Sequence, residues 1–231
     1  MRTIGFLGGM TYHSTALYYT LINGHIQRAL GGSASASLLM HSFNHAETAA
    51  LFSAGQWDAV AQKFILATKN LKAAGAHGIA IGCNLGHKVA EQLEIGAGLP
   101  VLHIADFTAA AIKERGLSKV ALLATRTAME DDFIKGRLKE KAGVEVLIPE
   151  EDDRIAINNA VFEELGAGVV TEKTKGLMKN VVAKLVKEGA QGVVLACTDL
   201  QFVLKPEDVS VPVLDTMELH AKGLADWSLE V

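Results

Sequence analysis

The sequence predicts an α/β protein built as two similar lobes, each a short parallel sheet flanked by helices. Short apolar runs alternate with segments of helical periodicity along the 231 residues. Such continuously apolar strands between helices are typical of parallel sheets covered on both faces. The same series of elements then occurs a second time along the chain, which indicates an internal duplication.

The first half contains the elements of one lobe. Apolar runs that predict strands lie at residues 3–7, 36–40, 78–82 and 99–104. Helical periodicity predicts helices over residues 14–30, 57–71 and 88–93. For the first helix, Ser14 is the expected N-cap and Gly31 the expected stop.

The second half repeats three landmarks in the same order. KVALLAT from Lys119 corresponds to TIGFLGG from Thr3, GAQGVVLACT from Gly189 to GAHGIAIGCN from Gly75, and VPVLDTME from Val211 to LPVLHIAD from Leu99. The offsets, 119 − 3 = 116, 189 − 75 = 114 and 211 − 99 = 112, are nearly constant. Any two βαβ units share apolar strands, but three ordered matches at one spacing favour duplication. With crossovers at Pro100 and Pro212, we expect a first lobe of residues 1–99 plus 212–231 and a second lobe of residues 100–211.

Composition excludes several classes of protein. The net charge of −4 and pI near 6.1 leave no basic footprint for nucleic acid or anionic membrane. No apolar run reaches membrane-spanning length, and the apolar stretch at the N-terminus is too short for a signal peptide. Two cysteines do not make a disulfide framework, so we expect reduced thiols in a cytoplasmic protein.

The chain's two cysteines, Cys83 and Cys197, each close an apolar strand of the repeat. Ligands of open parallel sheets bind outside the carboxyl ends of strands. If the lobes face each other through a pseudo-twofold axis, the thiols approach a small molecule from opposite sides. Inversion of a carbon acid needs a base on one face and a proton donor on the other, which a thiolate and a thiol supply. Buried structural cysteines are the alternative, but their equivalent positions favour chemistry.

Five stretches resemble the aspartate/glutamate racemase family, in order and over essentially the whole chain. They are GFLGGMTYHST from Gly5, CNLGHK from Cys83, ATRTAME from Ala124, ACTDL from Ala196 and PVLDTMELHA from Pro212. The resemblance is closest to the members specific for L-aspartate and L-glutamate. It implies two lobes related by pseudo-twofold symmetry with the site between them, no cofactor, a small amino-acid substrate and a homodimer.

The resemblance also implies the residues of the site. Cys83 and Cys197 correspond to the catalytic pair. The implied substrate-binding residues are Met10, Thr11, Asn84, Leu85, Thr125, Arg126, Thr198 and Asp199. His87, one helical turn past Cys83, is a supporting residue that could tune the thiol, with a backbone-bonded helix histidine as the equal alternative.

The sequence departs from the family pattern at several positions. Leu85 stands where the family has threonine and removes a hydroxyl from the carboxylate site. Asp199 replaces glutamate, and Ala124 replaces glycine. The N-terminal loop reads Met-Thr-Tyr-His-Ser-Thr from Met10, where the family has Met-Ser-Trp-Glu-Ser-Thr.

Other polar features have simpler readings. No C-x-x-C or H-E-x-x-H spacing is present, so no metal is expected, and no phosphate-binding glycine motif follows Gly8-Gly9. Arg126 could instead form a salt bridge at a helix start, and Asp199 could be a plain N-cap. His103 and His220 are expected in core or surface roles. The acidic run from Glu150 to Asp153 is expected to be a solvated loop.

These observations predict a cofactor-independent racemase that acts on aspartate or glutamate by two-base proton transfer between Cys83 and Cys197. The alternatives are another carbon-acid enzyme of the superfamily (a hydantoin racemase, a malonate-type decarboxylase or a maleate isomerase) or a non-catalytic protein that binds small acids. Leu85 is the residue that keeps the non-catalytic alternative open.

Overall fold

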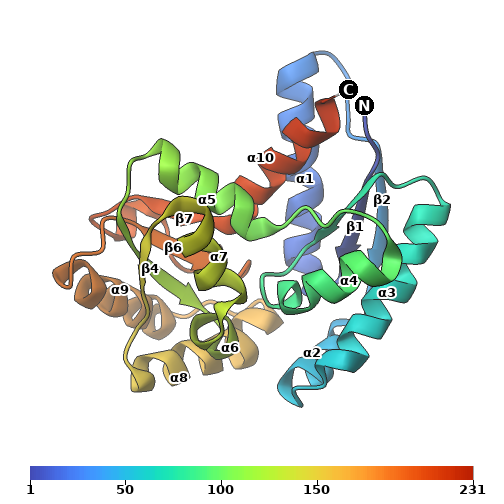
Figure 1. Cartoon of the computed structure of the whole chain (residues 1–231). Helices are drawn as coiled ribbons and strands as arrows, with labels where there is room; N and C mark the ends of the chain where they lie inside the picture. The colour runs from blue at the N-terminus through green and yellow to red at the C-terminus, as the bar shows by residue number, and fades with distance from the viewer. Residues whose placement is uncertain (231) are drawn as a thin grey trace. The chain divides into compact units, whose positions relative to one another are not determined.

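The computed structural model describes residues 1–230, which form two compact lobes (Figure 1). The first lobe comprises Met1–Ile104 and the C-terminal segment from His220, and the second comprises Ala105–Leu219. Each lobe contains a parallel sheet flanked by helices. The fold class predicted from the sequence is therefore confirmed.

The first lobe holds a three-stranded sheet with the order β2-β1-β3. Both pairings are parallel, with Ile4 in register with Leu38 on one side and with Gly78 on the other. Its elements are β1 (Ile4–Gly8), α1 (Tyr12–Leu30), β2 (Leu38–Ser42), α2 (His45–Ser53), α3 (Trp57–Ala73), β3 (Gly78–Ile81), η1 (Leu85–Val89) and α4 (Ala90–Ala97). The C-terminal part of α10 (Thr216–Leu229) also belongs to this lobe.

The second lobe holds a four-stranded parallel sheet with the order β5-β4-β6-β7. Helix α5 (Ile104–Glu114) leads into it. The further elements are β4 (Lys119–Ala124), α6 (Arg126–Glu130), α7 (Asp132–Ala142), β5 (Glu145–Leu147), α8 (Glu151–Asn159), η2 (Ala160–Glu164), η3 (Leu165–Ala167), α9 (Glu172–Lys187), β6 (Val193–Ala196), η4 (Leu200–Phe202), η5 (Pro206–Asp208) and β7 (Val213–Asp215).

The two strand orders are equivalent, as a duplicated chain requires. In each sheet the first strand in sequence lies between the second and the third, and the third strand precedes a cysteine. A fourth position is also shared, because Val101 forms an isolated parallel bridge to Ile79 of β3, where β7 pairs with β6 in the second lobe. The three landmarks of the sequence repeat are thus β1 and β4, β3 and β6, and the segments of Val101 and β7.

The chain changes lobe slightly later than the expected crossovers at Pro100 and Pro212. The Leu102 N–H donates to the Ile79 carbonyl at 2.8 Å, which holds this segment on the first sheet. Likewise β7 pairs with β6, so the residues up to Leu219 belong to the second lobe. The prolines stand at the starts of these edge segments, whose backbone hydrogen bonds keep them on the sheet they follow.

The C-terminal helix closes the first lobe, and Figure 1 shows the end of α10 next to the N-terminal segment. The Arg2 N–H donates to the Ser228 carbonyl at 2.7 Å, and the Ser228 hydroxyl donates to the Arg2 carbonyl at 2.6 Å. In the core of this lobe, Phe6 of β1 packs on Tyr18 of α1 with ring centroids 4.9 Å apart. Strand β1 is buried along its whole length, consistent with a sheet covered on both faces.

Several local expectations differ from the structure. Helix α1 begins at Tyr12 with Thr11 as N-cap, and not at Ser14, because the Thr11 hydroxyl accepts the Ser14 N–H at 3.4 Å. Gly31 ends this helix as expected. The acidic run is not a loop: Glu151, with the two aspartates after it, forms the first turn of α8, where carboxylates favour the helix dipole. Helix α2 was not anticipated.

Gly9, directly after β1, meets a steric requirement that only glycine satisfies. Its φ of +84° lies in the left-handed region. A Cβ on this residue would lie 2.1 Å from the Phe43 carbonyl oxygen. The close approach lets Phe43 donate its N–H to the Gly8 carbonyl at 3.0 Å, which extends the pairing of β1 and β2 to their carboxyl ends.

We predict that Gly9→Ala destabilises the first lobe by at least about 3 kcal/mol, because the clash is with backbone that cannot rotate away. The matched control is Gly32→Ala, where φ is +59° but no atom lies within 4 Å of the added Cβ. That change should cost only about 1 kcal/mol, the penalty for the backbone conformation alone. Urea unfolding measures the free energy of unfolding of both variants. Equal losses in the two variants would show that the Phe43 backbone leaves room for a Cβ at position 9.

Candidate active site

The carboxyl edge of the first sheet carries five of the residues implied by the sequence. Because β1 and β3 are parallel neighbours, the loops that follow them leave the same edge. One loop carries Met10 and Thr11, and the other carries Cys83, Asn84 and Leu85. All are buried except Cys83, which is partly exposed.

The second sheet repeats this arrangement. Strands β4 and β6 are parallel neighbours, and the segments after them carry Thr125 and Arg126, and Cys197, Thr198 and Asp199. Thr125, Thr198 and Asp199 are buried, whereas Cys197 is partly exposed. Each lobe therefore brings its own half of the sequence-predicted residues to one sheet edge.

The two cysteines occupy equivalent local structures. Both are free thiols, and each follows the strand beside the central strand of its sheet. A buried polar residue comes next, Asn84 in one lobe and Thr198 in the other. A 3₁₀ helix then begins within three residues, η1 or η4. Partial exposure distinguishes these thiols from structural cysteines, which are among the most completely buried residues.

Thr125 offers a polar group for a ligand in the second lobe. It follows β4 directly, and its side chain is only 6% exposed. Within residues 1–230 its hydroxyl oxygen is buried without a hydrogen-bond partner, although Thr125 stands at the N-cap position of α6. An unsatisfied buried hydroxyl costs about 1–3 kcal/mol, so a ligand that bonds to it recovers this energy.

His87 is tied to the backbone on both of its ring nitrogens. Its Nε2 accepts the Ile104 N–H at 3.2 Å, so Nδ1 carries the proton and donates to the Cys83 carbonyl at 2.9 Å. The ring is 2% exposed. His87 thus holds the Cys83 turn through the main chain, which is the backbone-bonded alternative to a residue that tunes the thiol.

His220 continues this buried network. A carbonyl can only accept, so His220 Nε2 donates to the Leu102 carbonyl at 2.9 Å, and Nδ1 accepts the Tyr18 hydroxyl at 2.9 Å. Its ring lies 5.9 Å from that of His87. Complete burial, followed by the neighbouring His87, lowers the pKa of His220 to about 3. The imidazole is therefore neutral in the folded protein near neutral pH.

Arg126 and Asp199 show features of the structural roles that were expected as alternatives to substrate binding, a salt bridge and an N-cap. The Arg126 guanidinium is bound to Glu130 at 2.8 Å and lies 3.5 Å from Glu151. The Glu130 carboxylate raises the pKa of Arg126 above its ordinary value. Asp199 precedes η4 at the N-cap position, but its side chain makes no capping hydrogen bond there.

One part of the first sheet edge carried no sequence signal. Strand β2 ends at Ser42, beside a cavity of about 380 Å³ lined by Phe43, Asn44, Glu47 and Lys63 among others. Lys63 forms an ion pair with Glu47 at 2.6 Å. The apolar run that predicts this strand ends at Met40, whereas β2 continues to Ser42. In the sequence, the polar end of the strand cannot be distinguished from a loop.

Within residues 1–230 no cluster of three or more His, Cys, Asp or Glu side chains could hold a metal ion. Over the same residues, no helix combines the length and apolar character needed to cross a membrane.

Comparison with known proteins gives consistent results. The sequence profile of the Asp/Glu/hydantoin racemase family matches residues 7–224. The chain is 42% identical to a Yersinia pestis protein assigned to the Asp/Glu racemases, with a TM-score of 0.91 and full coverage of both chains. It is 35% identical to an aspartate racemase homologue from Pyrococcus horikoshii, with a TM-score of 0.82 and full coverage of both. An aspartate racemase from Picrophilus torridus shares the fold at 18% identity and a TM-score of 0.74, over 99% of this chain and 94% of the other.

The two-lobed α/β fold is shared with the Asp/Glu racemase and the aspartate racemase homologue that match over their full lengths. The chain belongs to the Asp/Glu/hydantoin racemase family, whose profile spans residues 7–224. It is accordingly an isomerase, an amino-acid racemase.

We predict that His220 makes the protein acid-sensitive. Its pKa is lowered on folding, so the unfolded chain binds the proton first as the pH falls. Above about pH 6.5, the pKa of histidine in the unfolded chain, His220 does not reduce the free energy of unfolding. Below this pH the free energy of unfolding declines by about 1.4 kcal/mol per pH unit, until the pH reaches the folded pKa. His220→Gln keeps a donor for Leu102 and an acceptor for Tyr18 without this titration. Urea unfolding between pH 6.5 and 4.5 should show a steeper loss for wild type than for the variant, and parallel curves would contradict the assignment.

Proposed function

We propose that the protein is a cofactor-independent racemase of aspartate or glutamate that transfers protons through Cys83 and Cys197. The observation that carries the proposal is the equivalent placement of the only two thiols of the chain, each partly exposed at the carboxyl edge of its own sheet. The family assignment supports racemisation independently, and the names of its structural relatives refer to aspartate and glutamate.

The proton balance requires two groups in opposite states. One cysteine begins as a thiolate and removes the α-proton from one face of the amino acid, which leaves a planar carbanion. The other begins as a thiol and donates its proton to the opposite face, which forms the enantiomer. The thiolate has then become a thiol and the thiol a thiolate, so the reverse reaction uses the same groups with exchanged roles.

The residues around each thiol supply binding groups. A substrate carboxylate is recognised by charge-assisted hydrogen bonds from backbone and side-chain donors. Asn84, Thr198 and the Thr125 hydroxyl are buried polar groups at the two sheet edges, and we assign them to substrate binding. Met10 and Thr11 contribute the loop after β1, whose form is fixed by Thr15: its hydroxyl accepts the Gly9 N–H and donates to the Thr11 carbonyl, both at 2.8 Å.

Leu85 favours a second candidate, a racemase retuned to a less polar substrate. It is 6% exposed and follows Asn84 at the start of η1. An aliphatic side chain at this position provides no hydrogen bond to a carboxylate. The substrate would then carry an apolar group near its carboxylate, and aspartate and glutamate would be poor substrates.

The experiment that tests the function is proton NMR of the protein with a panel of amino acids in D₂O. Racemisation replaces the α-proton by deuterium, so the α-proton signal of a substrate disappears. We expect this loss for aspartate or glutamate, or for a less polar amino acid if Leu85 has changed the specificity. A protein that binds an amino acid without solvent exchange would be a binding protein and not a racemase.

We predict that Cys83→Ser and Cys197→Ser each reduce racemisation by orders of magnitude, because serine is a far weaker base near neutral pH. Each variant keeps one thiol, so each should still exchange the α-proton of one enantiomer without inverting it. The two variants should act on opposite enantiomers, which NMR in D₂O with pure L- and D-aspartate measures. Near-normal racemisation by either variant, or exchange of the same enantiomer by both, would refute the two-thiol assignment. Unchanged melting temperatures serve as the control for folding.

We predict that Leu85→Thr raises kcat/KM for aspartate or glutamate by at least several-fold. A restored hydrogen bond to a charged carboxylate contributes about 1.5–3 kcal/mol, which corresponds to roughly a ten- to hundred-fold gain in affinity. Leu93→Thr, a buried leucine of α4 outside the site, is the matched control and should not raise the rate. If wild type is already fast and Leu85→Thr has no effect, residue 85 does not contact the carboxylate.

A further inference from the structure

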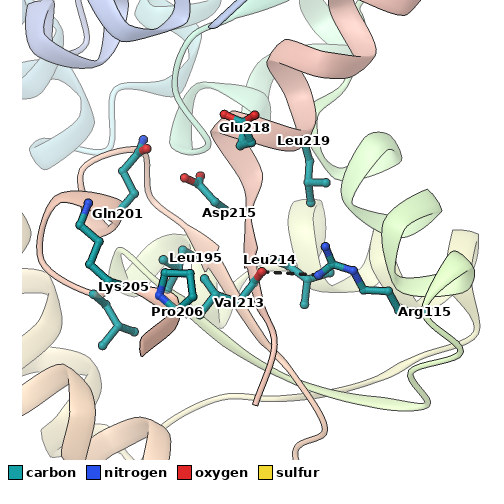
Figure 2. A pocket seen from close by; sticks show the side chains of 11 residues that line it. Arg115, Leu195, Gln201, Lys205, Pro206, Val213, Leu214, Asp215, Glu218 and Leu219 are labelled. Atoms are coloured by element: carbon teal, nitrogen blue, oxygen red, sulfur yellow. Dashed lines mark hydrogen bonds between the residues drawn. The ribbon is translucent and has the colours of Figure 1, made fainter. Parts of the chain in front are cut away.

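The second lobe contains a cavity of about 310 Å³ that is separate from the residues assigned to the reaction (Figure 2). It lies beside β7, the edge strand of the sheet. Its volume is at the lower end of the range for small-molecule sites, about 300–1,000 Å³. The apolar part of its lining comes from Leu195, Leu204, Pro206, Val213, Leu214 and Leu219.

Charged side chains of both signs surround this apolar lining. Figure 2 shows Asp215 and Glu218 at one end of the hollow, Lys205 across from Asp215, and Arg115 at the far side. Lys205 lowers the pKa of Asp215 through its charge, yet the two form no ion pair. In the described part of the chain neither Lys205 nor Arg115 has a carboxylate within ion-pair distance; Arg115 donates only a long hydrogen bond, 3.4 Å, to the Val213 carbonyl.

The negative charge of the Asp215 carboxylate is poorly compensated by its surroundings. One of its oxygens accepts the Met217 N–H at 2.9 Å and so caps α10. Burial nevertheless raises the pKa of Asp215 to about 6, against the opposing effects of the backbone donors and Lys205. Glu218 adds to the rise through its negative charge. A cation in the cavity beside Asp215 would remove this penalty.

We propose that this cavity binds a free α-amino acid with an aliphatic side chain. The α-ammonium group would lie at Asp215 and Glu218, and the α-carboxylate at Lys205. The side chain would cover the leucines of the apolar lining. A simple cation would face Lys205 and Arg115, and a simple anion would face the two carboxylates, so the cavity fits a zwitterion better than either.

Binding here needs neither cysteine, because no residue assigned to the reaction lines the cavity. The cavity nevertheless lies close to the Cys197 turn. Gln201, one of its lining residues, donates its amide to the Thr198 carbonyl at 3.0 Å. Asp215 is in register with Leu195, which precedes Cys197 by two residues.

The probe for this site is L-leucine, titrated into the full chain in the presence of excess L-aspartate and followed by calorimetry or protein NMR. Two analogues each lack one charge: 4-methylpentanoate has no ammonium group, and 3-methylbutylamine has no carboxylate. We expect saturable leucine binding with a Kd on the order of 1 mM or tighter, and at least about tenfold weaker binding of both analogues.

The variants Asp215→Asn and Lys205→Gln should each weaken leucine binding about tenfold or more. Asparagine also caps helices, so the first change keeps the α10 terminus. Glu207→Gln is the matched control, because this exposed residue is adjacent in sequence to Pro206 but does not line the cavity. Its leucine affinity should equal that of wild type.

Leucine affinity should also fall as the pH drops below about 6, where Asp215 takes up a proton. Glu218, Lys205 and Arg115 are the other charged groups around the cavity. Absence of saturable leucine binding would overturn the proposal. So would equal affinity for either analogue, or leucine binding that neither Asp215→Asn nor Lys205→Gln weakens. None of these outcomes depends on whether the protein racemises aspartate.

Discussion

Parallel pairing of the central strand with the strand before each cysteine is the constraint on which the site depends. Parallel neighbours end at the same edge of a sheet, so the segments after β1 and β3, and those after β4 and β6, are brought together within their lobes. The loops can then carry polar and reactive groups while the strands carry the core. Close backbone contacts support the pairing. One is the approach of Gly9 to Phe43, which leaves no room for a side chain at position 9.

The duplicated topology explains why both thiols have the same local setting. A fold that reuses one strand order places the third strand of each lobe beside the first, and a cysteine follows that strand within two residues in both copies. The polar neighbours differ, Asn84 in one copy and Thr198 in the other. The two copies therefore share the position of the cysteine and differ in the polar residue that follows it.

Much of this could be predicted from the sequence, because it rests on local signals. The apolar runs gave the central strands within a residue or two, and the glycines at positions 31 and 75 marked the ends of helices. The N-cap of α1 was misplaced because Thr11 and Ser14 are both good capping residues, and their hydrogen bonding decides between them. The acidic start of α8 is indistinguishable from a loop in the sequence, because charge alone does not separate a solvated segment from a first helical turn.

The features that could not be predicted depend on residues far apart in the chain. His87 and His220 both bond to backbone at the Leu102–Ile104 segment, and Tyr18 reaches His220 across 202 positions of sequence. The cavity beside β7 likewise combines Arg115 with side chains from Leu195 to Leu219. Such contacts carry no periodicity or spacing that a single sequence reveals. They decide which histidines are structural and which carboxylate is held in an apolar setting.

The central claim is that inversion uses two different thiols, one to remove the proton and one to return it. Its most direct measurement is the position of deuterium early in the reaction of wild-type protein with L-aspartate in D₂O. With two bases, the D-aspartate formed at initial times carries α-deuterium, while the remaining L-aspartate keeps its α-proton. Deuterium that enters both enantiomers equally from the start, or D-aspartate that retains the original proton, would indicate a single base and contradict the account.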